Sequence, residues 1–246
     1  MPRLIEHLVE PQRLLLCWQA RESEKRSRYQ VGELIKQGDD VVLRYSSGSD
    51  MEAAKQAGFK GYPAFPLKQM EHKHQVIEAF IRRLPPRSRR DFGRYLELRA
   101  IAPEAEISDF ALLGYSGAKL PDDGFELVHP FDEPPETFEV LIEVAGFRHE
   151  AEVSPKALQP GDTIQLKPEP GNQYDAEAIR VESRGGKLGY VPRGHLTMLH
   201  RMLQQGASLS GEIFRINGTS ERPLVYVLVQ VVRASGLNHN PVKLQA

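Results

Sequence analysis

Three side chains suited to ligand binding lie close together within residues 170–181. Asn172, Tyr174 and Asp175 occupy a polar turn that runs into an alternating segment typical of a strand. Loops held by a rigid strand commonly carry binding residues, and this turn offers a ring for stacking and two groups for hydrogen bonding. The alternative is a structural turn, in which Asp175 caps backbone amides and Tyr174 packs on Pro170.

A second polar group follows within residues 187–193. Tyr190 supplies another ring, and Pro192 ends the predicted strand. Arg193 then places a cation at the start of a helix predicted over residues 194–205. We expect the two groups to form one binding surface.

The sequence shows no arrangement typical of an enzyme. It has no Ser-His-Asp set, P-loop or G-x-G-x-x-G motif, and no paired carboxylates stand out. His72 and His74 lack further metal ligands at a suitable spacing, and His195 and His200 point apart on the predicted helix. Cys17 stands alone, which leaves no disulfide framework and no cysteine zinc site. We expect no catalytic site, no metal and no cofactor.

The overall charge of the chain is close to neutral. Its 246 residues include 32 basic and 33 acidic side chains, so any contact with nucleic acid needs a local patch. The first twenty residues show neither a signal peptide nor a membrane span. The sequence therefore predicts a cytoplasmic protein without a membrane partner.

Six arginines are concentrated in the thirteen residues 82–94. Arginine forks suit phosphate groups, so Arg87, Arg89 and Arg90 form a candidate phosphate patch. The alternative, which we favour, is a solvated helix face whose charge is balanced by neighbouring acids such as Asp91.

The hydrophobic pattern divides the chain into two halves. Residues 1–129 contain alternating strands followed by helical segments, which predicts an α+β domain of unknown role. Asp50 and Ser108 are expected to cap two of its helices. Residues 130–137 are rich in proline and acidic side chains and predict a linker.

The second half is predicted to be mainly β. Residues 138–234 contain six strand-like segments and one good helix, which favours a small, partly closed six-strand barrel. Residues 235–246 are predicted to be a tail.

Four separated motifs in the second half closely resemble the HIRAN domain family. They occupy residues 144–149, 158–166, 170–181 and 187–193, in the family's order and spacing. The resemblance covers about residues 138–232. It implies an OB-like barrel that binds single-stranded DNA, in particular at 3' ends.

The resemblance also implies roles for individual residues. Arg148 and His149 match the family's basic and aromatic pair, although histidine is a weaker stacking platform than tyrosine. Tyr174 and Asp175 match its stacking ring and hydroxyl acceptor, and Arg193 matches its phosphate-binding cation. With two expected pocket walls added, the predicted DNA-binding residues are Arg148, His149, Asn172, Tyr174, Asp175, Tyr190 and Arg193.

The first half resembles, more loosely, the N-terminal portion of HipA-type proteins. The similar residues are 31–34, 65–66, 83–85 with Arg90, and 110–114. The likeness includes no ATP-binding or phosphotransfer segment, so it implies a fold and no kinase activity.

These features predict a two-domain accessory protein that captures single-stranded or frayed 3' DNA ends in repair, replication-fork or defence processes. The alternative is a protein-interaction adaptor that docks a helicase or nuclease and does not bind DNA itself. An adaptor does not need Arg148, Tyr174 and Arg193 to converge, so the geometry of the groove distinguishes the two. A nuclease with an unrecognised N-terminal site is the least favoured interpretation.

Overall fold

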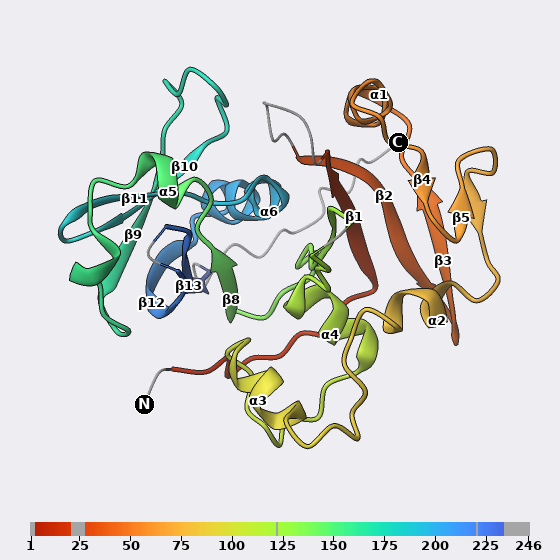
Figure 1. Cartoon of the computed structure of the whole chain (residues 1–246), viewed down its shortest axis with the longest axis horizontal. Coiled ribbons are helices and arrows are strands. Elements are labelled where there is room, and N and C mark those ends of the chain that lie inside the picture. Colours follow the sequence, from red (N-terminus) through yellow and green to blue (C-terminus); the bar gives the residue numbers. More distant parts are fainter. Residues whose placement is uncertain (1–2, 21–27, 122, 220, 234–246) are drawn as a thin grey trace, which may run out of the picture.

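The computed structural model describes residues 3–20, 28–121, 123–219 and 221–233. It is a mixed α/β chain with two larger antiparallel sheets, which lie on opposite sides of Figure 1. Helix α6 (Arg193–Gln204) lies between them. No helix of the described ranges is long and apolar enough to cross a membrane.

The first sheet has the strand order β6-β3-β2-β1-β7. Its strands are β1 (Arg13–Gln19), β2 (Arg28–Gln37), β3 (Asp40–Tyr45), β6 (Glu71–His72) and β7 (Phe125–Val128). Strand β7 returns after the helices and pairs with β1. All its residues are buried, so it lacks the alternation by which a half-buried strand is recognised in sequence.

Four short helices accompany the first sheet in the described part of the chain: α1 (Ser49–Gln56), α2 (Val76–Ile81), α3 (Phe92–Glu97) and α4 (Asp109–Ser116). A small hairpin of β4 (Gly61–Tyr62) and β5 (Phe65–Pro66) follows α1. Ser108 caps α4 as predicted, since its hydroxyl accepts from the Ala111 N–H at 2.9 Å. Asp50 does not cap α1, because the helix begins before it; its carboxylate accepts from the Gln30 N–H at 3.1 Å.

The second sheet has six antiparallel strands in the order β11-β10-β9-β12-β13-β8. They are β8 (Thr137–Glu143), β9 (Thr163–Pro168), β10 (Ile179–Ser183), β11 (Gly186–Tyr190), β12 (Ser208–Gly218) and β13 (Pro223–Val232). A helical turn, α5 (Phe147–Glu150), and a 3-10 turn, η1 (Pro155–Ala157), lie between β8 and β9.

The predicted six strands are therefore confirmed, whereas a barrel is not. Strands β8 and β11 remain the edges of the sheet. One isolated bridge, between Ala145 and Tyr190, joins the segment after β8 to β11 without closing the ladder. The partly closed barrel stays a prediction.

Buried apolar residues of both halves form one continuous core. Phe131, from the predicted linker, and Phe138 of β8 are both buried, and their rings stack with centroids 4.6 Å apart. The buried carboxylate of Glu139 accepts from the Glu6 and His7 N–H groups at 3.2 and 3.1 Å. The division at residues 130–137 stays a prediction, but the two sides are packed together.

Candidate nucleic-acid interface

The loop between β9 and β10 is organised by the side chain of Asn172. Its Oδ1 accepts from the N–H groups of Tyr174 and Asp175 at 2.9 and 3.1 Å. Its Nδ2 donates to Glu169 at 3.0 Å and to the Tyr190 hydroxyl at 2.9 Å. A carboxamide suits this position, because it can accept on one side and donate on the other. Asn172 thus fixes the loop against β11.

Tyr174 is the most exposed large hydrophobic side chain of the described residues, with 95% of its surface accessible. The ring therefore does not pack on Pro170, and that part of the structural-turn interpretation is wrong. The other part is correct, since Asp175 Oδ1 accepts from the Glu177 N–H at 3.0 Å. Oδ2 of Asp175 makes no hydrogen bond to the described residues, so the same side chain can shape the turn and accept a further donor.

Five of the seven predicted residues line one groove of about 470 Å³ beside this loop. Part of its lining is apolar and buried, from Ala178, Val191 and Leu196. The predicted residues in the groove are Asn172, Tyr174, Asp175, Tyr190 and Arg193. An exposed ring, a carboxylate and a guanidinium therefore border a shared apolar surface.

Arg148 and His149 do not line this groove, so the predicted convergence is incomplete. Both are exposed on α5, whose packing buries their neighbour Phe147. Glu150, the last residue of the same turn, does line the groove. The motif at residues 144–149 does not indicate how this helical turn is oriented against the sheet. The sequence therefore predicted that all seven residues would lie in one groove.

Lys187 of β11 belongs to the same hydrogen-bond network, although the sequence interpretation did not select it. Its ammonium donates to the Tyr190 hydroxyl at 2.8 Å and to Glu150 at 2.7 Å. Burial opposes its charge, but these two bonds outweigh burial and raise the pKa of Lys187. The Asn172 amide, followed by the Tyr190 hydroxyl, lowers the pKa of Glu169. Lys187 is the first residue of the motif at residues 187–193, and this position could have identified it from the sequence as a site residue.

Arg193 connects the groove with the first half of the chain. Its side chain is 51% exposed and lies 3.9 Å from Asp50 Oδ1. Arg193, Asp50 and Asp175 also line a neighbouring hollow of about 200 Å³, together with Arg28 of β2. The ion pair with Asp50 is long and solvated, so Arg193 remains available to an anionic ligand.

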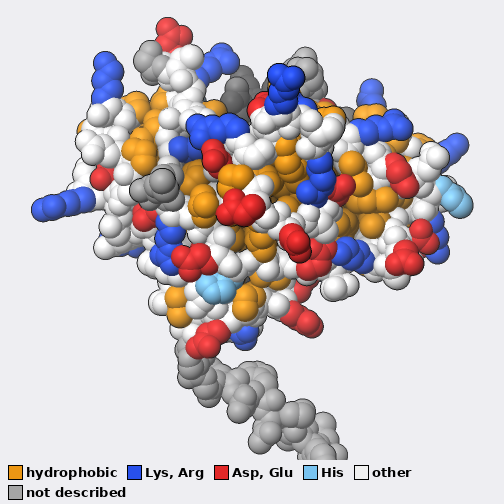
Figure 2. Space-filling view, turned by 90° about the horizontal axis from the view of Figure 1, so that it is seen from below, with side chains coloured by type: hydrophobic (Ala, Val, Ile, Leu, Met, Phe, Trp, Pro, Cys, Tyr) orange, Lys and Arg blue, Asp and Glu red, His pale blue; other side chains and the backbone are white. Residues whose placement is uncertain are grey.

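The candidate phosphate patch lies elsewhere. In Figure 1 the loop before α3 is at the bottom of the molecule, whereas the loop after β9 projects from the top. Arg87 pairs with Asp109 at 2.6 Å and Arg89 with Asp91 at 2.6 Å, and Arg90 is exposed. Figure 2 shows basic and acidic side chains interspersed on the face seen from below. This arrangement favours the solvated face for Arg87 and Arg89.

The described residues contain one group with metal-ligand spacing, formed by Glu6, His7 and Glu139. Its buried carboxylate is already engaged by two backbone N–H groups. His72, which the sequence analysis weighed as a metal ligand, is buried against β5, and its Nε2 lies 3.2 Å from the Pro66 carbonyl oxygen. The contacts among Glu6, His7 and Glu139 therefore attach the N-terminal segment to β8.

Residues 137–232, in the C-terminal half of the chain, match the family model of the HIRAN domain. No curated protein matches the chain. Two solved structures are similar to parts of it. The crystal structure of the HIRAN domain of human HLTF is 18% identical, covering 39% of this chain and 77% of that chain, with a TM-score of 0.33. The crystal structure of a protein from Lactobacillus plantarum is 24% identical, covering 40% and 99%, with a TM-score of 0.34.

Proposed function

We propose that this chain is a nucleic-acid-binding accessory protein whose HIRAN domain captures single-stranded DNA at 3' ends. The observation that carries the proposal is the 95% exposed ring of Tyr174, at the rim of a groove that Arg193 also lines. Ring stacking tolerates any base, and a cation beside the ring can contact the phosphate backbone. The HIRAN match supports nucleic-acid binding in general.

The loop that carries Tyr174 and Asp175 is held by hydrogen bonds within the protein. The four hydrogen bonds of Asn172 hold the backbone of Tyr174 and Asp175 in place. Ordering a loop only on binding would cost part of the interaction free energy, so an ordered loop favours affinity. In the proposal, Tyr174 stacks on the last base and Asp175 accepts from the terminal hydroxyl.

The remaining parts of the proposal concern setting and scaffold. We place the protein in the cytoplasm, in DNA repair, replication-fork or defence processes, as a binding protein without catalysis or cofactor. The six-strand sheet would serve as an OB-like platform for the DNA strand. An OB-like platform holds several nucleotides, and the groove beside Tyr174 would take the terminal ones.

One observation favours the alternative of a protein-interaction adaptor for a helicase or nuclease. Arg148 and His149 lie outside the groove, so fewer cationic and aromatic groups converge than the resemblance implies. An adaptor would bind neither free nor blocked DNA ends.

The direct experiment is fluorescence anisotropy with labelled single-stranded oligonucleotides that differ only at the 3' end. We expect saturable binding that is tighter for a free 3'-hydroxyl than for a blocked end. Equal binding to both ends would contradict end capture, and no binding to either would favour the adaptor.

A further inference from the structure

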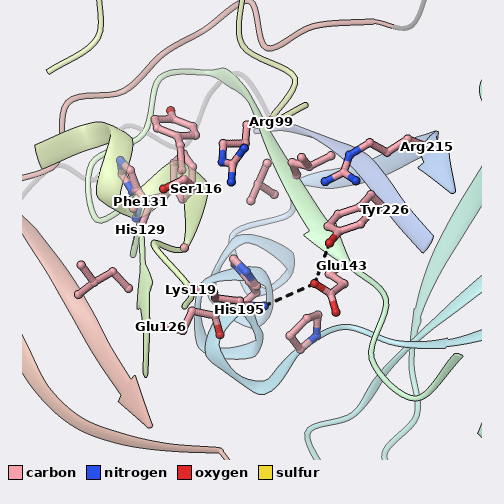
Figure 3. A pocket seen from close by; sticks show the side chains of 17 residues that line it. Arg99, Ser116, Lys119, Glu126, His129, Phe131, Glu143, His195, Arg215 and Tyr226 are labelled. Atoms are coloured by element: carbon pink, nitrogen blue, oxygen red, sulfur yellow. Dashed lines mark hydrogen bonds and ion pairs between the residues drawn. The ribbon is translucent and has the colours of Figure 1, made fainter. Parts of the chain in front are cut away.

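A second pocket lies where the two halves of the chain meet, with a volume of about 150 Å³. Cavities of roughly this size hold a molecule as large as benzene. Figure 3 shows its lining side chains arriving from both halves, including Arg99 after α3, Lys119 after α4, and Arg215 and Tyr226 from the second sheet. None of the groove residues of the HIRAN domain lines it.

The two carboxylates of this pocket are already neutralised. Glu126 is buried and lies 3.1 Å from the Lys119 ammonium, and it also pairs with Arg28. Glu143 accepts from the Tyr226 hydroxyl at 3.1 Å and lies 3.7 Å from Lys119. Burial opposes the charge of Glu126, but Lys119 and Arg28 outweigh it and lower its pKa. These groups need no further ion.

Two arginines of the pocket have no carboxylate partner among the described residues. The Arg99 guanidinium stacks 3.5 Å from the Tyr95 ring centroid and donates to the Tyr95 carbonyl at 2.9 Å. The Arg215 guanidinium lies 3.5 Å from the Tyr226 ring centroid and donates to the Leu98 carbonyl at 3.0 Å. Two like charges thus share one cavity. Rings and carbonyl oxygens hold them, and neither guanidinium forms an ion pair with a carboxylate of the described residues.

This arrangement is costly in the absence of a ligand. Burial lowers the pKa of both arginines, and the charge of Arg215 lowers that of Arg99 further. Arginine nevertheless stays protonated, so the positive charges remain. In addition, Arg99 Nε and His195 Nδ1 are buried without a hydrogen-bond partner. Buried charges and polar groups are normally paired, and a partner is missing here.

The counter-ion that fits is an anion. The ionisable side chains lining the pocket comprise three cations, Arg99, Lys119 and Arg215, against two carboxylates, Glu126 and Glu143, while burial lowers the pKa of His129 and His195 to about 4. Guanidinium forks match the oxygens of phosphate with two parallel hydrogen bonds. We propose that the pocket between the two halves binds a small phosphate-class anion, either inorganic phosphate or a small phosphate monoester, through Arg99 and Arg215.

The test is calorimetric titration of the full chain with inorganic phosphate at constant ionic strength, with chloride as the compensating anion. We expect saturable binding to the wild type, and at least tenfold weaker binding to Arg99→Gln and to Arg215→Gln. Arg44→Gln is the matched control, because Arg44 lies on β3, away from the pocket, is exposed and pairs with Glu71. It should bind phosphate as the wild type does.

A parallel titration with glycerol phosphate distinguishes the two sources of the anion. Tighter binding of the monoester than of phosphate identifies an organic ligand, and the reverse identifies inorganic phosphate. Absence of saturable binding to the wild type overturns the proposal, whatever the variants do. Equal binding by the wild type, Arg99→Gln and Arg215→Gln also overturns it.

Folding and DNA binding are checked separately. Arg99→Lys and Arg215→Lys keep the charge and lose the fork, and should fold while binding phosphate more weakly than the wild type. Oligonucleotide binding in the groove does not depend on this pocket, so failure of either proposal leaves the other standing.

Discussion

At the scale of single residues, Tyr174 is exposed while its backbone is fixed by Asn172. Tyr174→Ala should weaken binding of single-stranded DNA by roughly 1–3 kcal/mol, whichever base is offered, because a stacking surface is lost. Anisotropy with homopolymeric oligonucleotides measures this loss. Met70→Ala removes another exposed large side chain, on the segment before β6, and should leave affinity unchanged. An equal loss in both variants would mean that Tyr174 does not stack on DNA.

Asp175 supports a second prediction, on the chemistry of the DNA end. Asp175→Asn keeps an oxygen for the Glu177 N–H but loses the charge that strengthens a bond from a hydroxyl. We expect a loss on the order of 1 kcal/mol for a free 3'-hydroxyl. Against a 3'-phosphate the variant should bind better than the wild type, because the repulsion of two anions is removed. If the variant binds both ends as the wild type does, end recognition through Asp175 is wrong.

The residues of the groove could be selected from sequence, whereas their arrangement could be foreseen only in part. Tyr174 and Arg193 belong to motifs that also contain the ends of the neighbouring strands. Both residues line the groove. Arg148 and His149 stood in an equally clear motif and lie outside it. Their position depends on how Phe147 packs beneath α5, which is a tertiary contact and leaves no local pattern.

At the scale of elements, α6, which begins at Arg193, lies between the two sheets, whereas the loop before α3 that carries the clustered arginines is at the bottom of Figure 1. Arg193→Ala should reduce the salt slope of DNA binding by about 0.7, the value for one phosphate contact on a single strand. The triple change of Arg87, Arg89 and Arg90 to alanine should leave the slope unchanged, because two of these side chains pair with aspartates. A flatter salt slope in the triple variant would indicate that these arginines do contact phosphates.

The elements themselves were predictable where local chemistry decides them. Ser108 caps α4, and α6 begins and ends within one residue of the predicted helix. The failures have tertiary causes. Strand β7 is buried on every side, and Asp50 is drawn to the Gln30 N–H of a neighbouring strand instead of capping α1.

At the scale of the whole molecule, we expect the buried His129 and the half-buried His195 to make stability depend on pH. The Nδ1 atom of His129 accepts from the Phe131 N–H at 2.9 Å, and its Nε2 lies 3.0 Å from the Val9 carbonyl, which fits a neutral ring. Burial lowers the pKa of His129 to about 4, against an ordinary value of 6.5. The unfolded chain therefore takes up the proton first as pH falls. The contribution of neutral His129 to the stability of the folded state is therefore complete above pH 6.5 and is lost as the pH falls towards 4.

We expect the free energy of unfolding in urea to fall over this interval by up to about 3 kcal/mol for His129 alone. His129→Gln should flatten the dependence, and His74→Gln, at an exposed position, should not. His195 adds to the effect, since burial lowers its pKa to about 4 as well. An unchanged pH dependence in His129→Gln would contradict this assignment.

The joint core was beyond the reach of the sequence. The alternation of apolar and polar residues in β8 predicts that Phe138 faces the core. This alternation does not identify the residue that Phe138 contacts there. That partner is Phe131, and the partners of Glu139 are the N–H groups of Glu6 and His7, more than 130 positions away.

This packing bears on how the chain could be rearranged in evolution. A domain with a self-contained core can pass between genes as a cassette. Residues 137–232 moved alone would leave the Glu139 carboxylate without the N–H groups that donate to it, and Phe138 without the ring of Phe131. A fusion that carried this HIRAN domain into a new protein would have to bring the N-terminal segment with it, or exchange Glu139 for an apolar residue. The ancestry of the two halves is therefore expected to be shared, and comparison of gene trees built separately from each half would reveal it.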